Sequence, residues 1–185
     1  MVFGPAMQNV EFKAELRDLD LARAICRKIG AVHIGDLRQT DTYMRVTNGR
    51  LKRRECPGEP TEVIFYERPN RTGPRLSSFT IYSEEQAHER FGNKPLPVWV
   101  RVVKQRTFFL LGNIRIHLDV VEDLGTFIEF EALVSSSQTT EKCRAAIAKL
   151  RETFMPVIGE PISSSYSDLM ACELETTPVE PPDHA

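Results

Sequence analysis

The chain has 185 residues, 41% of them hydrophobic and 27% charged, which is typical of one globular domain with a sizeable core. Its formal net charge of −2 argues against a surface that binds nucleic acid over its whole extent. The four cysteines include no C-x-x-C pair, which argues against a disulfide framework or a zinc site. We find no secretory leader and no apolar run of about 20 residues, so we expect a cytoplasmic protein with reduced thiols and no membrane partner.

Strands dominate the elements that the first half of the chain predicts. After a strand over 8–17, Asp18 or Asp20 caps a helix that ends at Gly30. Extended segments follow over 32–40, 42–47, 50–55, 62–68 and 77–82, and Asn48-Gly49 is a strong hairpin signal. Ser83 begins a second helix, which should stop before Gly92.

The second half predicts three long strands, over 98–111, 114–122 and 127–134. An amphipathic helix over 139–154 should turn Cys143, Ile147, Leu150 and Phe154 toward the core. A short helical piece over 165–171 closes a single domain of residues 1–171, and the Pro- and Glu-rich tail 172–185 is expected to be disordered.

Charged residues recur at every second position in four segments, with mostly apolar residues between them. Successive side chains of a strand point to opposite faces, so each segment presents one ionic row and one apolar or mixed row. The segments are Glu11-Phe12-Lys13-Ala14-Glu15-Leu16-Arg17, Arg50-Leu51-Lys52-Arg53-Arg54, Arg115-Ile116-His117-Leu118-Asp119-Val120 and Glu129-Phe130-Glu131.

Two arrangements account for these rows. The ionic rows can face water over an ordinary apolar core, or they can line the inside of a barrel whose outside is apolar. Like charges sit close together along the rows, which disfavours an exposed sheet, and the helices over 20–29 and 139–154 need an apolar surface to cover. We therefore predict a mainly β, α+β fold: an eight-stranded antiparallel β-barrel with a charged lumen and helices packed outside.

The ionic rows also predict what the lumen binds. Arginine forks and lysine point charges match the oxygens of a triphosphate, and carboxylates bind magnesium or manganese beside it. No Walker-type glycine-rich loop is present, so side chains would hold the phosphates. The candidate phosphate-binding cations are Lys13, Arg50, Lys52, Arg54, Lys104, Arg106 and Arg115, and the candidate metal ligands are Glu11, Asp119, Glu129 and Glu131.

These residues and their order resemble the CYTH superfamily of triphosphate tunnel metalloenzymes, over about residues 9–170. The resemblance is closest to the class IV adenylate cyclase-like branch. The matching segments are Asn9-Val10-Glu11-Phe12-Lys13, Asp41-Thr42-Tyr43, Gly49-Arg50-Leu51-Lys52-Arg53-Arg54-Glu55, Ile64-Phe65-Tyr66-Glu67-Arg68-Pro69, Val103-Lys104-Gln105-Arg106, Arg115-Ile116-His117-Leu118-Asp119, Phe127-Ile128-Glu129-Phe130-Glu131 and Tyr166-Ser167-Asp168-Leu169-Met170. Asn9 departs from the signature, which has a glutamate there, and this puts a second metal site in question.

The resemblance implies roles for particular residues. Glu11, Glu129 and Glu131, with Asp119, would hold Mg²⁺ or Mn²⁺, and the seven cations together with Arg68 would bind the triphosphate. Lys13, Arg115 and Asp119 would be catalytic, and Tyr66 is balanced between packing and substrate contact. We expect His117 to be a hydrogen-bonded filler and the single tryptophan, Trp99, to pack without a functional role.

The implied activity is that of an adenylate cyclase, which converts ATP to cyclic AMP and pyrophosphate. Hydrolysis of tripolyphosphate, thiamine triphosphate or a nucleoside triphosphate remains an alternative, because both reactions use the same cations. A non-catalytic module that binds polyphosphate or nucleotide is a third hypothesis. The expected partner is a small-molecule triphosphate rather than nucleic acid, and a homodimer is left open.

Overall fold

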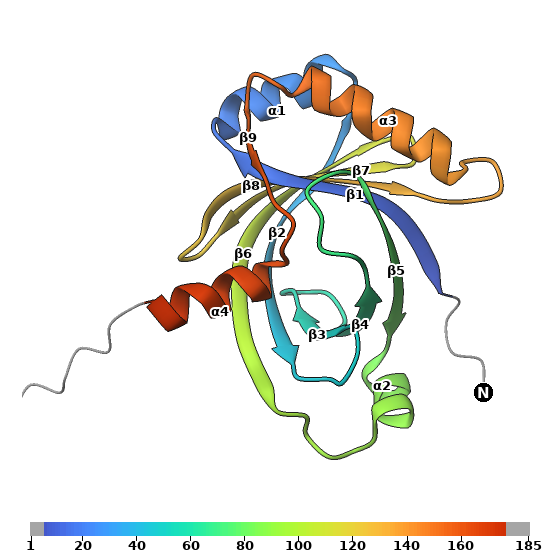
Figure 1. The fold of residues 1–185 in the computed structure, drawn as a ribbon, viewed down its shortest axis with the longest axis vertical. Coiled ribbons are helices and arrows are strands. Elements are labelled where there is room, and N and C mark those ends of the chain that lie inside the picture. The colour runs from blue at the N-terminus through green and yellow to red at the C-terminus, as the bar shows by residue number, and fades with distance from the viewer. Residues whose placement is uncertain (1–5, 177–185) are drawn as a thin grey trace, which may run out of the picture.

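Eight antiparallel strands close into a barrel in the computed structural model, which describes residues 6–176 (Figure 1). The strand order is β5-β4-β3-β2-β6-β7-β8-β1, and pairing of β1 with β5 closes the ring. This confirms the predicted fold class. The strands are β1 (Met7–Leu16), β2 (Val32–Met44), β3 (Arg50–Glu55), β4 (Glu62–Glu67), β5 (Arg75–Tyr82), β6 (Val98–Leu111), β7 (Ile114–Val121) and β8 (Gly125–Leu133).

Two strands differ from the sequence-based expectation. β2 is one continuous strand rather than two, because β6 pairs with it along its whole length. A ninth strand, β9 (Ile158–Pro161), was not predicted, since its glycine and proline lower the β-propensity of a four-residue segment. It pairs with β1 beyond the end of the β5 pairing.

Four helices, α1 (Leu19–Lys28), α2 (Glu84–Phe91), α3 (Thr140–Thr153) and α4 (Tyr166–Thr176), accompany the strands of the described chain. Asp18 caps α1, where its side chain accepts a hydrogen bond of 2.8 Å from the Leu21 N–H. Ser83 and Gln86 form a capping box at the start of α2, as predicted. Helix α4 includes positions 172–176, which had been assigned to the tail; the rest of that tail lies outside the described residues. Among residues 6–176, no helix is both long enough and apolar enough to span a membrane.

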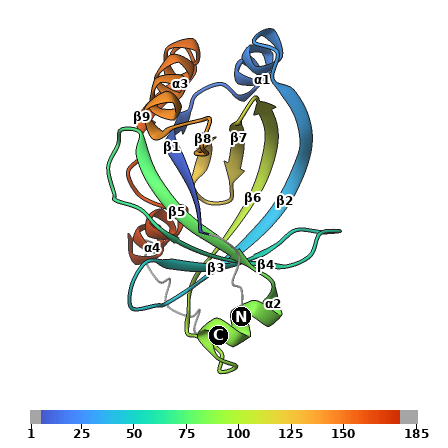
Figure 2. The same ribbon diagram turned by 90° about the vertical axis from the view of Figure 1, so that its right-hand side faces the viewer.

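Helices α1 and α3 lie over β1, β7 and β8 on the outside of the barrel (Figure 2). The apolar rows of these strands pack against the two helices and therefore point outward. Phe12 and Phe130 lie directly opposite each other on β1 and β8, with ring centroids 6.1 Å apart. Phe154, at the end of α3, packs on Phe130 from the other side. Segments 10–13 and 128–131 are thus neighbours in the sheet, and their apolar residues belong to the main core.

The ionic rows of the same strands point inward. Lys13 lies opposite Glu129, which lies opposite His117, and all three side chains are buried. Directly opposed residues share one face of a sheet, so the charged row crosses β1, β8 and β7 on the inner face. The predicted orientation of the barrel wall is therefore confirmed.

Helix α4 departs from the expectation that every helix packs outside. Tyr166 and Met170 pack on Tyr43, Val100 and Phe127. Tyr43 lies opposite Lys52, which is part of the ionic row, so this apolar cluster is on the inner face. α4 thus packs on the inner face of the barrel wall next to β6 (Figure 1).

Replacement of Phe130 by Ala should destabilise the protein by about 3–5 kcal/mol, because it opens a cavity in the main core. Met155→Ala is the control, since that side chain is exposed and its loss should change the free energy of unfolding by no more than about 0.5 kcal/mol. Urea unfolding of both variants measures the difference. Equal losses would contradict an apolar core between the barrel and α3.

Candidate functional site

Alternate positions on the strands bring cations and carboxylates together inside the barrel. The cations are Lys13, Arg50, Lys52, Arg54, Arg68, Arg75, Lys104, Arg106 and Arg115, and the carboxylates that contact them are Glu11, Asp41, Asp119, Glu129, Glu131 and Asp168. The structure therefore gathers in one interior all the charged residues that the sequence predicted as site residues. Ionised groups in such a place need partners, because burial removes their hydration.

Asp41 lies at the centre of the most buried ion cluster. Its carboxylate, which is fully buried, accepts hydrogen bonds from Lys104 Nζ at 2.7 Å, Arg54 Nε at 2.7 Å and Lys52 Nζ at 3.0 Å. Burial alone would raise the pKa of Asp41, but the three cations hold it well below its usual value. One carboxylate thus serves three cations, and the cluster has a surplus of two positive charges when both lysines are protonated.

The pKa values of the two lysines in this cluster reflect both their burial and this surplus of positive charge. Burial lowers the pKa of Lys104 to about 7, with Asp41 opposing the shift and Arg54 and Arg106 adding to it. Burial and the charge of Arg54 lower the pKa of Lys52 to about 8, again against Asp41. Both amines therefore titrate near neutral pH, far below the ordinary lysine range.

Asp119 is held by a bidentate arginine. Arg106 Nε and Nη2 each donate a 2.7 Å hydrogen bond to Asp119, and the hydroxyl of Tyr166 donates a third at 2.8 Å. Burial would raise the pKa of Asp119, but Arg106 lowers it to about 2. The carboxylate is thus ionised and occupied, and it fixes the guanidinium of Arg106 in the barrel interior.

His117, Glu129 and Glu131 offer ligand atoms that all lie within 4.8 Å of one another. His117 Nδ1 is buried and lies 3.5 Å from Glu129 Oε2, outside hydrogen-bond geometry, and it has no hydrogen-bond partner among residues 6–176. Burial and the charge of Arg106 lower the pKa of His117, which favours the neutral imidazole that a metal requires. Two carboxylates and one imidazole with a vacant nitrogen suit a divalent cation such as Mn²⁺ or Mg²⁺.

Of the four predicted ligands, Glu129 and Glu131 belong to this group, whereas Asp119 and Glu11 do not. Glu11 lies 2.8 Å from Arg75 Nε, on the neighbouring strand β5 where Arg75 is its direct register partner, and 3.0 Å from Arg68 Nε, just past the end of β4. The Arg75 side chain is entirely buried and also donates to the carbonyls of Arg71 and Ile162. Asn9 shares the inward row with Glu11, and its buried side-chain oxygen has no hydrogen-bond partner within the described chain.

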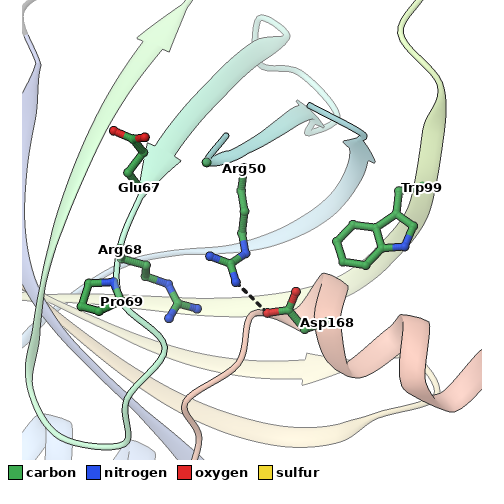
Figure 3. A pocket seen from close by; sticks show the side chains of 7 residues that line it. Arg50, Glu67, Arg68, Pro69, Trp99 and Asp168 are labelled. Carbon is green, nitrogen blue, oxygen red and sulfur yellow. Dashed lines mark hydrogen bonds and ion pairs between the residues drawn. The ribbon is translucent and has the colours of Figure 1, made fainter. Parts of the chain in front are cut away.

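An open cleft of about 640 Å³ lies at the mouth of the barrel, where Arg50 and Arg68 reach from the interior (Figure 3). Arg50 Nη2 donates a 2.9 Å hydrogen bond to Asp168 Oδ2 on α4. Trp99 borders the same cleft, with Gly49, Glu67 and Pro69. Gly49 must be glycine here, because its φ is +70° and an added Cβ would meet the ring of Phe65 at 2.7 Å.

Sequence reasoning missed Asp41, Arg75 and Trp99 as site residues. Asp41 belonged to a matching motif, but its role depends on neighbours that β3 and β6 bring from distant positions. The available signal was its alternation with Gln39 and Tyr43 along β2, which places all three on the inner face. No pattern in the sequence pointed to Arg75 or Trp99.

A closed antiparallel barrel with buried ion pairs inside defines this as a tunnel protein whose interior suits a polyanion and a metal ion. The chain belongs to the CYTH domain family, whose model matches residues 7–156. No match was found among curated proteins.

Solved structures share the fold at low sequence identity. A protein of Pyrococcus horikoshii superimposes with a TM-score of 0.71 at 19% identity, covering 87% of this chain and 98% of its own. A protein of Vibrio parahaemolyticus, provisionally described as an adenylate cyclase, gives 0.68 at 17% identity and covers 88% and 97%. A candidate adenylyl cyclase of Hippeastrum, described as having a dominant triphosphatase activity, gives 0.53 at 13% identity and covers 96% and 100%.

Asp41→Asn should lower the free energy of unfolding by about 3–5 kcal/mol, because it leaves three buried cations without their shared carboxylate. Added tripolyphosphate should restore more stability to this variant than to the wild type, since it supplies the missing negative charge. Thermal unfolding with and without the polyanion measures both effects.

The matched control is Glu122→Gln, which removes an exposed carboxylate that lies 3.2 Å from Arg38 and should cost less than about 1 kcal/mol. Should Asp41→Asn be as mild as this control, Asp41 would not be the carboxylate that holds the three cations.

Proposed function

We propose that this protein is a metal-dependent enzyme that acts on a triphosphate bound inside the barrel. The observation that carries the proposal is the single carboxylate, Asp41, shared by Lys52, Arg54 and Lys104. Buried cations that lack enough internal counterions create a strong site for an external anion. A triphosphate, with about four negative charges, has the charge and the length to pair with several of these cations at once.

The cations lie on different walls of the barrel, which suits an elongated anion. Lys52 and Arg54 come from β3, Lys104 and Arg106 from β6, and Arg115 from β7. Asp41 and Asp119 hold these cations of β3 and β6 in place in advance, so an arriving phosphate chain meets donors that are already oriented. The bidentate fork of Arg106 and the point charges of the lysines would then divide the phosphate oxygens between them.

His117, Glu129 and Glu131 are the residues that would hold the divalent metal. Bound there, the metal would neutralise phosphate oxygens and activate the attacking hydroxyl or water. Lys13 Nζ lies 3.4 Å from Glu129 and 3.7 Å from the centre of the Tyr166 ring, next to the metal-binding group. Lys13 and Arg115 would therefore offset charge on the reacting phosphate, whereas Asp119 would act by orienting Arg106.

Among reactions on a triphosphate, we place cyclisation of ATP first and hydrolysis second. The cleft at the barrel mouth leaves room for an organic group attached to the phosphate chain, which inorganic tripolyphosphate lacks. The fold-level likeness to the Vibrio parahaemolyticus protein supports cyclisation, and the likeness to the Hippeastrum protein supports hydrolysis as the second candidate. Both reactions use the same cations and the same metal ligands.

Incubation of the purified protein with Mg²⁺ or Mn²⁺ and a panel of ATP, tripolyphosphate and thiamine triphosphate tests the proposal. We expect cyclic AMP and pyrophosphate from ATP; orthophosphate would identify the hydrolase instead. Glu129→Gln should abolish turnover without unfolding the protein, because it removes a charged metal ligand.

Glu122→Gln serves as the surface control for this variant and should keep full activity. Tight binding without any product across the panel would reject an enzyme and support a binding module. Undiminished turnover in Glu129→Gln would reject the metal-ligand role of that residue.

Triphosphate binding should take up protons, because an anion beside Lys104 and Lys52 raises their pKa values, which burial lowers to about 7 and about 8. Affinity should therefore fall as pH rises from 7 toward 10, by up to about tenfold per pH unit for each lysine. Calorimetry at pH 8 in buffers of different ionisation enthalpy counts the protons.

Lys104→Arg is the informative variant, because a guanidinium stays protonated over this range. The proton uptake should shrink in this variant while binding persists. Uptake that is absent from the wild type, or unchanged in both Lys104→Arg and Lys52→Arg, would contradict the assignment.

A further inference from the structure

The half-buried indole of Trp99 lines the cleft at the barrel mouth, next to charged side chains. Figure 3 shows Trp99 on one side of the cleft and Arg68 with Pro69 on the other, with Arg50 and Asp168 between them. Trp99 also packs against the apolar cluster of Tyr166 and Met170, which anchors the indole at this position. The guanidinium carbon of Arg45 lies over this ring, 5.6 Å from its centroid, and the indole is still only half-buried, so part of its surface is available for stacking against a flat ring.

The cleft is continuous with the ionic interior through two arginines. Arg68 lines the cleft and also contacts Glu11, which is buried in the interior. Arg50 lines it as well and comes from the same face of β3 as Lys52 and Arg54. A phosphate chain held by the interior cations would therefore end beside Arg50 and Arg68, and any group attached to it would enter the cleft.

The carboxylates of the cleft indicate the chemistry of that group. Asp168 Oδ2 accepts hydrogen bonds of 2.9 Å from Arg50 Nη2 and from the Ser165 N–H, and a carboxylate has lone pairs for further donors beyond these two. Burial would raise the pKa of Asp168, but these donors lower it, so the side chain is an ionised acceptor. Glu67 adds an exposed carboxylate at the rim of the cleft.

We propose that this cleft is a head-group subsite, in which Trp99 stacks on a planar nitrogen heterocycle of the triphosphate substrate and Asp168 accepts a hydrogen bond from its amino group. The inference rests on the proposed function, and it restricts the substrate to organic triphosphates. The ring of a nucleobase and the aminopyrimidine of thiamine share the required chemistry. Trp99 is then a specificity residue rather than a packing residue as the sequence suggested.

Trp99 is the only tryptophan of the chain, so its fluorescence reports on this subsite directly. Titrations should use an ATP analogue with methylene groups in place of both bridging oxygens, thiamine triphosphate, and methylene-bridged tripolyphosphate, with Mg²⁺ present. We expect quenching on binding of a heterocyclic ligand, with the stronger signal identifying the preferred ring. The inorganic ligand should bind, as calorimetry will show, with little change in fluorescence.

Substitution of Trp99 provides the energetic test. Trp99→Leu should weaken binding of the ATP analogue about tenfold, as expected for loss of one stacking contact, and should leave tripolyphosphate affinity within about twofold. Trp99→Phe keeps a flat ring and should recover most of the loss. The ratio of the two affinities within one variant is independent of small changes in stability.

The outcomes separate this inference from the proposed function. Failure of all three ligands to bind would overturn the triphosphate site itself. Binding of all three with equal affinity, no quenching and no effect of Trp99→Leu on their ratio would overturn the subsite alone. An equal loss of both ligands in Trp99→Leu would show that Trp99 supports the barrel mouth rather than the ring.

Discussion

The surplus of positive charge around Asp41 is the constraint on which the rest of the structure depends. A buried carboxylate that contacts Lys52, Arg54 and Lys104 makes these cations compatible with the interior, but it does not neutralise them. The barrel wall must then be apolar on its outer face, because the usual core position is taken by charge. Helices α1 and α3 supply that core from outside, against the outward rows of β1 and β8.

The interior carboxylates have two different tasks. Asp41 and Asp119 are fully buried and hold cations at fixed positions, as counterions that stabilise the barrel interior. Glu129 and Glu131 are less firmly held, at 3.2–3.6 Å from their cations, and they face the vacant nitrogen of His117. Such a division separates the residues that organise the anion site from those that are available to a metal ion.

The period-2 alternation predicted both the barrel and the orientation of its wall, because side-chain direction in a strand is a local property. Helix α4 differs from the expected outside position, since the sequence of this short helix does not say which surface it will cover: Met170 packs in the cluster on the inner face. The partners of Asp41 follow from register over long separations, and Trp99 gains its setting only when β6 meets α4. The sequence thus indicated which kind of site the interior forms. It did not indicate which cation pairs with which carboxylate, or which residues form the cleft at the barrel mouth.

Diffraction from crystals soaked with Mn²⁺ and tripolyphosphate tests most directly whether the barrel interior holds a metal–triphosphate. We expect an anomalous manganese peak beside His117, Glu129 and Glu131. Phosphate oxygens should contact Lys52, Lys104 and Arg106. An interior whose ion pairs are unchanged, with the anion bound only on the outer surface, would contradict it.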